Sequence, residues 1–98
     1  MDVRVRVPTQ LRDLVAGSTS VEVSVGATSD QSTTVAAVLD ALAGQYPALE
    51  RRIRDEQGRT RLHVNLFVDS DNVRDLTGTA SPIRAGQELS IIPAVSGG

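Results

Sequence analysis

Valine alternates with polar residues in two segments near the start of the chain, residues 2–8 and 21–25. A period of two places alternate side chains on opposite faces of a β-strand, so both segments are predicted to be half-buried strands. Pro8 ends or edges the first strand. The polar stretch that follows carries apolar residues able to pack as a lid, Leu11, Leu14 and Val15. Together the two strands predict a β-hairpin with a long loop.

Apolar residues then recur at helical spacing, at Val35, Val38, Leu39, Leu42 and Tyr46. This stripe predicts one main helix, with Ser32, Thr33 or Thr34 as its N-cap. Gly44 is expected just past the end of that helix. Leu49 and Ile53 suggest a further short helical turn, which Gly58 closes.

Strand periodicity returns in residues 62–68, and a tight polar turn is predicted at residues 69–72. Val73 is expected to begin a short fourth strand, and residues 76–86 are expected to be irregular. Alternation at residues 89–92 predicts the last strand. The predicted order, β-β-α-β-β-β, describes an α+β domain in which a sheet packs on a single helix.

Composition narrows the classes of function. The 98 residues suit one domain, and the net charge of −2 gives no general attraction to nucleic acid or an anionic membrane. The absence of cysteine excludes a disulfide, a thiolate metal site and a cysteine nucleophile. No signal peptide or membrane-spanning apolar run is recognisable, so a cytoplasmic location is expected.

The C-terminal sequence ends in Gly97 and Gly98. Glycine has no Cβ, so such an end can thread extended into a channel that a side chain would block. The four residues Val95, Ser96, Gly97 and Gly98 reach about 13 Å when extended, which would carry the terminal carboxylate into another protein's active site. We therefore expect two parts, a domain at residues 1–94 and a flexible tail at residues 95–98.

Three stretches resemble the ubiquitin-like β-grasp sulfur carriers, the ThiS/MoaD family. They are Val64-Asn65-Leu66-Phe67-Val68 with the later Asn72-Val73-Arg74, then Ile83-Arg84-Ala85-Gly86-Gln87-Glu88-Leu89, and finally Ile91-Ile92-Pro93-Ala94-Val95-Ser96-Gly97-Gly98. The likeness spans nearly the whole chain, and the ending looks most like the actinobacterial carrier for cysteine synthesis. Ser96 departs from the family, where alanine is commoner. The resemblance implies a β-grasp fold, with a mixed sheet of four to five strands packed on one main helix.

The same resemblance implies a chemistry centred on Gly98. An E1-like enzyme would use ATP to adenylate its carboxylate, and a sulfur donor would then convert it to a thiocarboxylate. Val95, Ser96 and Gly97 would thread into the partner's active site. The carrier would be a protein co-substrate rather than an enzyme, with no cofactor or metal of its own.

Partners follow from that chemistry. The family implies an E1-like adenylyltransferase and a sulfur-accepting enzyme, with a pyridoxal-phosphate-dependent cysteine synthase favoured and thiamine, molybdopterin or thio-metabolite synthesis as alternatives. A metalloprotease would release the product. The free protein is expected to be a monomer that binds neither nucleic acid nor membrane.

A docking face can be predicted from the strand alternation. If the valines and leucines face the helix, the opposite face carries Arg4, Arg6, Asn65, Phe67, Ser90 and Ile92. An outward Phe67 beside an outward Ile92, rimmed by arginines, is typical of a partner site. Scattered apolar residues are also normal on protein surfaces.

Other polar motifs favour ordinary structural interpretations. The arginine-rich stretch at residues 50–61 has no interleaved aromatics and is interpreted as a solvated face. Asp69 and Asp71 begin like a calcium loop, but Val73 and Arg74 break the ligand pattern, so a plain turn is predicted. His63 is interpreted as a surface strand residue.

Two further functions stay open at this point. The chain could be a β-grasp binding module with an inert tail, or a ubiquitin-like modifier conjugated to lysines. All ten basic residues are arginine, so an activated C-terminus would find only the N-terminal amine as an acceptor on the same chain or on another copy of it.

Overall fold

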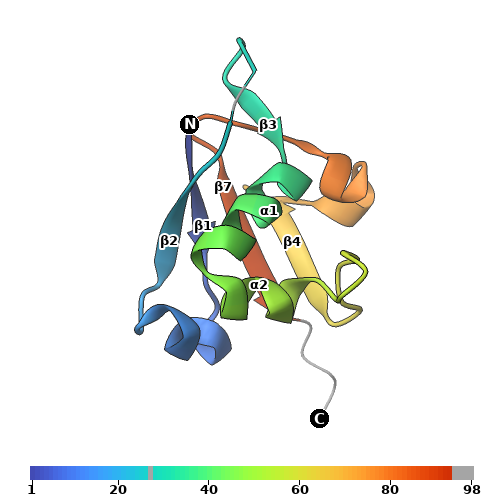
Figure 1. Ribbon diagram of the computed structural model, residues 1–98. Coiled ribbons are helices and arrows are strands. Elements are labelled where there is room, and N and C mark those ends of the chain that lie inside the picture. Colours follow the sequence, from blue (N-terminus) through green and yellow to red (C-terminus); the bar gives the residue numbers. More distant parts are fainter. Residues whose placement is uncertain (27, 94–98) are drawn as a thin grey trace.

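The computed structural model describes residues 1–26 and 28–93, so the predictions on Val95, Ser96, Gly97 and Gly98 lie outside the described residues. A five-stranded sheet is crossed on one face by two helices, and a two-stranded sheet lies beside it (Figure 1). The large sheet contains β1 (Asp2–Arg6), β2 (Ser20–Ser24), β4 (Val64–Val68), β5 (Asp71–Asn72) and β7 (Glu88–Pro93). The helices are α1 (Val35–Gln45) and α2 (Pro47–Ile53).

The strands of the large sheet follow the order β2-β1-β7-β4-β5. β1 is antiparallel to β2 but parallel to β7, and β7 is antiparallel to β4. A parallel pair needs a crossover connection, which the helices between β1 and β7 supply. The β-grasp architecture and the mixed sheet predicted from the resemblance are therefore confirmed.

The core lies between the sheet and the helices and is built almost wholly from valine, leucine and isoleucine. The alternating valines of β1 and β2 point into it, and Val5 and Val23 are fully buried. The predicted helical stripe is buried at Val38, Leu39 and Leu42. The lid is a 3₁₀ helix at Thr9–Val15, in which Val15 is buried.

Thr34 is the N-cap of α1, because its hydroxyl accepts a hydrogen bond from the amide of Ala37 at 3.1 Å. The prediction that Gly44 follows the helix is wrong, since α1 continues to Gln45. The ring of Pro47 disfavours a helical conformation for Tyr46, so the proline rather than the glycine ends the helix. Pro47 then occupies the first turn of α2, where its missing N–H is no loss.

The prediction of a strand starting at Val73 is also wrong. β5 ends at Asn72, and Val73 begins a 3₁₀ turn, Val73–Asp75. The Asn72 side chain accepts a hydrogen bond from the Arg74 amide at 3.0 Å, and this cap turns the backbone out of the strand. Likewise Leu62 stands before β4 and is exposed, because the strand starts only at Val64.

Two three-residue strands were not predicted, β3 (Ser32–Thr34) and β6 (Pro82–Arg84). They pair antiparallel and close the end of the molecule that holds the N-terminus (Figure 1). A 3₁₀ turn, Gly78–Ala80, precedes β6. No helix within residues 1–26 and 28–93 is long and apolar enough to cross a membrane.

Candidate docking site around the last strand

The last strand, β7, is held on both sides in the middle of the sheet. It pairs with β1 over Glu88–Ser90 and with β4 as far as Pro93, which lies opposite Val64. Strand pairing therefore holds the backbone as far as Pro93. Because β1 and β7 are parallel, both strands end on the side of the sheet opposite the N-terminus (Figure 1). Arg6 and Pro93 are the last residues of these two strands.

The outer face, defined as the sheet surface turned away from α1 and α2, carries the predicted docking residues. Phe67 lies opposite Ser90, and Asn65 lies opposite Ile92. Phe67 and Ile92 are therefore diagonal cross-strand neighbours, close enough for large side chains to touch. Ile92 is 46% exposed, whereas Phe67 is partly buried between β7 and β5.

The two arginines of β1 differ in their position on this face. Arg6 stands opposite Ser90, in the same row as Phe67. Arg4 stands opposite Glu88 and Glu22, nearer the N-terminal end of the sheet. Each arginine lies 3.8 Å from a glutamate, Arg4 from Glu22 and Arg6 from Glu88. The structure therefore brings Arg6, Asn65, Phe67 and Ile92 together and places Arg4 further away.

Pro93 separates two hollows in the surface. The smaller, of about 390 Å³, includes Arg6, Arg12 and Ile92. The larger, of about 940 Å³, is lined by residues of the lid, of α2 and of the loop before β4. We call this larger hollow the arginine groove, because four arginines line it: Arg51, Arg52, Arg59 and Arg61.

The sequence interpretation of residues 50–61 as a solvated face missed this groove. Those arginines are exposed, as expected, but they surround a hollow that reaches Pro93. The signal that could have found it is an apolar residue, Leu62, directly after Arg61 at the end of the arginine-rich stretch. Leu62 is 83% exposed, and its carbonyl accepts a hydrogen bond from Arg74 at 3.2 Å.

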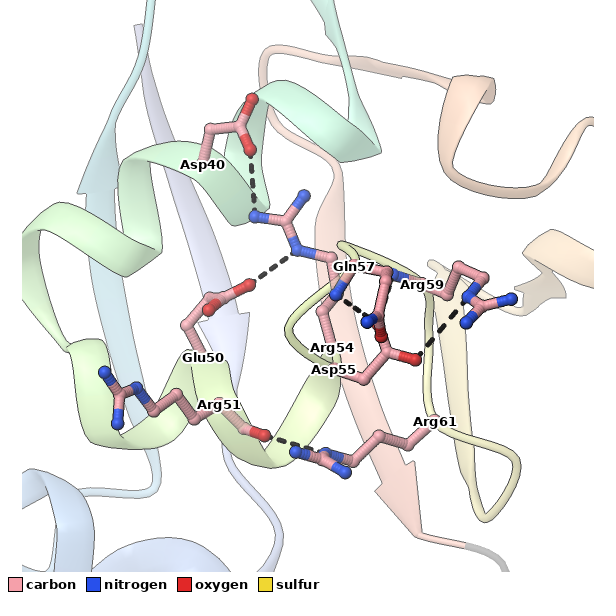
Figure 2. Close-up of polar contacts among 8 residues, drawn as sticks. All are labelled: Asp40, Glu50, Arg51, Arg54, Asp55, Gln57, Arg59 and Arg61. Atoms are coloured by element: carbon pink, nitrogen blue, oxygen red, sulfur yellow. Dashed lines mark hydrogen bonds and ion pairs between the residues drawn. The ribbon is translucent and has the colours of Figure 1, made fainter.

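Polar contacts hold together the elements around the groove (Figure 2). Arg54, only 12% exposed, binds Asp40 at 2.8 Å and Glu50 at 2.5 Å, joining α1 to α2. Burial opposes its charge, but hydrogen bonds to Glu50 and Asp40 outweigh that effect and raise the pKa of Arg54. Arg61 Nε donates to the carbonyl of Arg51 at 2.8 Å.

Asp55 organises the loop that follows α2. Its Oδ1 accepts hydrogen bonds from the amides of Arg59 and Gln57, each at 2.9 Å (Figure 2). The Arg59 amide, then that of Gln57, lowers the pKa of Asp55, so the carboxylate stays ionised at neutral pH. Arg59 Nε lies 3.6 Å from this carboxylate.

The remaining candidates have structural roles. Asp69 lies in the predicted turn, where its carboxylate accepts hydrogen bonds from the Glu88 amide and the Gln87 side chain. His63 is exposed. In the part of the chain that the structure describes, no three His, Asp or Glu side chains gather as a metal site would require.

Comparison with known proteins agrees with this architecture. The profile of the ThiS family matches residues 5–98. The sulfur carrier protein CysO of Mycobacterium tuberculosis is 35% identical over the full length of both chains. Small archaeal modifier protein 1 of Haloferax volcanii is 40% identical over 86% of this chain and 87% of its own.

Solved structures show the same fold. The crystal structure of M. tuberculosis CysO superposes with a TM-score of 0.76 at 34% identity, covering 95% of this chain and 99% of CysO. A chain in the crystal structure of the Amycolatopsis orientalis BexX/CysO complex gives a TM-score of 0.81 at 31% identity, covering 98% of this chain and 99% of that one.

Fold and sequence together define a small ubiquitin-like β-grasp protein whose outer face carries both polar and apolar side chains. The chain belongs to the ThiS family of sulfur carriers. Members of this family act as protein substrates of other enzymes rather than as catalysts, and this chain is a protein of that kind.

Proposed function

We propose that this carrier is activated at Gly98 and delivers sulfur as a thiocarboxylate. The observation that carries the proposal is the placement of β7. This strand is paired on both sides, it ends at Pro93, and five residues that finish in Gly-Gly follow it. The full-length alignment with CysO supports it, because the last residues fall within the matched region.

The proposed chemistry proceeds in two displacements. The Gly98 carboxylate attacks the α-phosphate of ATP on an E1-like enzyme, and pyrophosphate leaves. The resulting acyl adenylate is a good electrophile, which hydrosulfide supplied by a sulfur donor attacks at the carbonyl carbon, with loss of AMP and a proton. A thiocarboxylate remains on Gly98, anionic at neutral pH and nucleophilic.

The chain contributes positioning to this chemistry. A fixed strand delivers the tail, and Val95–Gly98 can extend about 13 Å into the partner's active site. Ser96 is small enough to pass a narrow channel. We assign the docking contact to Phe67 and Ile92, with Asn65 and Arg6 beside them and Arg4 at the periphery.

Cysteine synthesis is the acceptor pathway that we favour, because CysO of M. tuberculosis is similar over its whole length. Sulfur would pass to a pyridoxal-phosphate-dependent synthase, and a metalloprotease would release the product. Thiamine, molybdopterin or thio-metabolite synthesis are the alternative acceptor pathways. The likeness to a carrier in a BexX/CysO complex supports a dedicated partner protein for this chain as well.

A role as a protein modifier is the second candidate. The observation that favours it is the 40% identity to small archaeal modifier protein 1. The two functions share the adenylation of Gly98 and differ in what attacks next, a sulfur donor or a lysine amine. Covalent adducts of higher mass in cell extract that survive thiol reduction would identify the modifier.

ATP–pyrophosphate exchange tests the shared first step. The full chain should support exchange by an E1-like enzyme from the same source, and a chain lacking Gly98 should not. Because Gly98 lies beyond every described strand, the shortened chain should keep the circular dichroism and unfolding midpoint of the full chain. Exchange that persists without Gly98 would exclude activation at this residue.

A further inference from the structure

The arginine groove carries a local charge that the net charge of −2 conceals. Four arginines line it against a single carboxylate, that of Asp55. Asp55 is already engaged by Arg59 and by two backbone amides. Arg51, Arg52 and Arg61 form no ion pair with any residue in the ranges 1–26 and 28–93.

The backbone that carries these arginines is held in place, and the Arg61 side chain is anchored as well. Arg51 and Arg52 belong to the last turn of α2, and the Arg51 carbonyl holds Arg61. Arg54 ties α2 to α1 through Asp40 and Glu50 (Figure 2). The anchored Arg61 side chain loses less entropy on binding than a free arginine would, and the fixed backbone keeps Arg51 and Arg52 at the rim of the groove.

An apolar anchor lies next to the charges. Leu62 is the most exposed of the large hydrophobic residues identified in the described chain. Its backbone is held in place, because Arg74 donates hydrogen bonds to the carbonyls of both Leu62 and Val64 at 3.2 Å. An exposed apolar side chain on a held backbone, next to arginines, gives the apolar centre and charged surroundings of a protein-binding surface.

The groove also reaches Pro93, the residue before the chain continues to Gly98. Any enzyme that takes up the tail must place the mouth of its active site against this end of the molecule. Its surface there would meet Arg51, Arg52 and Arg61. Carboxylates at that mouth would pair with them, steer the encounter and fix the register of the tail.

We propose that the arginine groove docks an acidic segment of the enzyme that receives the tail, with Leu62 as its apolar contact. This proposal rests on the proposed function for the identity of the partner. Nucleic acid is a poorer fit, because among the residues that line the groove only His63 is aromatic.

The first test needs no partner enzyme. The isotope-labelled full chain is titrated by NMR at low salt with a decaglutamate peptide, and in parallel with a single-stranded oligonucleotide of equal charge. The peptide should shift the amides of Arg51, Arg52, Arg61 and Leu62, and the shifts should fade as salt rises. No groove shifts, or stronger binding of the oligonucleotide, would overturn the proposal.

The second test uses a matched pair of charge reversals, Arg52→Glu in the groove and Arg84→Glu in β6 near the start of β7. Both side chains are exposed, and both changes alter the net charge equally. In thiocarboxylate formation, Arg52→Glu should raise KM about fivefold at low salt with kcat unchanged, because a rim charge mainly affects encounter. Arg84→Glu should change KM less than twofold, about the scale of a distant charge.

The outcomes separate this inference from the proposed function. If the wild-type chain is converted and the two reversals behave alike, the groove is not a docking site but the carrier function stands. If no conversion occurs with the wild-type chain, the proposed function fails, and the peptide titration still decides whether the groove binds acidic segments.

Discussion

Ile92 on β7 lies directly opposite Asn65 on β4 and diagonal to Phe67, one residue before the strand ends at Pro93. The apolar contact and the origin of the tail are thus parts of one rigid strand. A partner that covered Ile92 would also hold Pro93, the residue that precedes position 94. In the proposed function, docking at Ile92 and delivery of Gly98 would be coupled through the backbone of β7.

Replacing Ile92 by serine should therefore weaken binding of the partner more than it lowers the stability of the fold. Ile92 is 46% exposed, and burying this exposed part at an interface contributes about 1–2 kcal/mol to binding. Losing that contribution should raise KM for activation roughly tenfold. Leu76→Ser is the matched control, because Leu76 is 49% exposed and lies outside the outer face. Equal effects of the two changes on KM would argue against docking at Ile92.

Truncating a core residue should have the opposite signature. Leu39 is fully buried on α1, and Leu39→Ala should lower the free energy of unfolding by about 2–5 kcal/mol through lost burial and a cavity. Leu62→Ala, at 83% exposure, should change it by less than about 0.5 kcal/mol. Urea unfolding followed by circular dichroism measures both, and a large loss for Leu62→Ala would mean that this residue packs in the core.

Arg54 should be a structural residue despite its place among surface arginines. Arg54→Leu would leave Glu50 and Asp40 without their shared cation and should cost about 1–3 kcal/mol of unfolding free energy, less than for a fully buried pair. Arg52→Leu, which breaks no described ion pair, is the control. A stable Arg54→Leu variant would show that α1 and α2 hold together without this contact.

Asp55 should make the stability of the fold depend on pH in the acidic range. Its pKa is lowered in the folded chain from the ordinary value of 3.8, chiefly by the Arg59 amide, so its stabilising effect is present above pH 3.8 and is lost as the pH falls below that value. The difference in urea midpoint between the wild-type chain and Asp55→Asn should be largest near pH 7 and vanish in acid. A difference that persists unchanged below pH 3 would exclude this source.

The carrier should not conjugate to itself. It contains no lysine, and the Met1 amine is partly buried and donates to the Val25 carbonyl at 3.0 Å. Incubation with the activating enzyme and ATP should yield no covalent dimer on a denaturing gel. Arg84→Lys, which adds one exposed amine, tests whether a suitable acceptor would be used. Dimers of the wild-type chain would show that the Met1 amine is accessible after all.

The sequence predicted those elements whose side chains carry a clear period. The valines of β1 and β2, the stripe of α1 and the alternation of β7 all reflect burial on one face, and burial is what a periodic pattern records. β3 and β6 escaped prediction because three residues are too few for a period. Their pairing brings together residues about fifty positions apart.

Two of the wrongly predicted boundaries have local reasons. A proline at residue 47 ended α1 where a glycine at residue 44 was expected to, and the side chain of Asn72 capped a turn where a strand was expected. The residues of the outer face could be predicted from the alternation of side chains along the strands alone. The arginine groove did not, because it joins α2, the lid and Pro93, which no single segment of sequence shows to be neighbours.

The central claim is that sulfur is carried on Gly98, and the mass of the C-terminal peptide tests it most directly. The chain is incubated with ATP, a sulfide source and an E1-like enzyme from the same source, then cut with trypsin, whose last site is Arg84. The account predicts that the peptide of residues 85–98 gains the mass of one sulfur in place of one oxygen. An unchanged peptide, under conditions in which the same enzyme converts its own known carrier, would contradict the account.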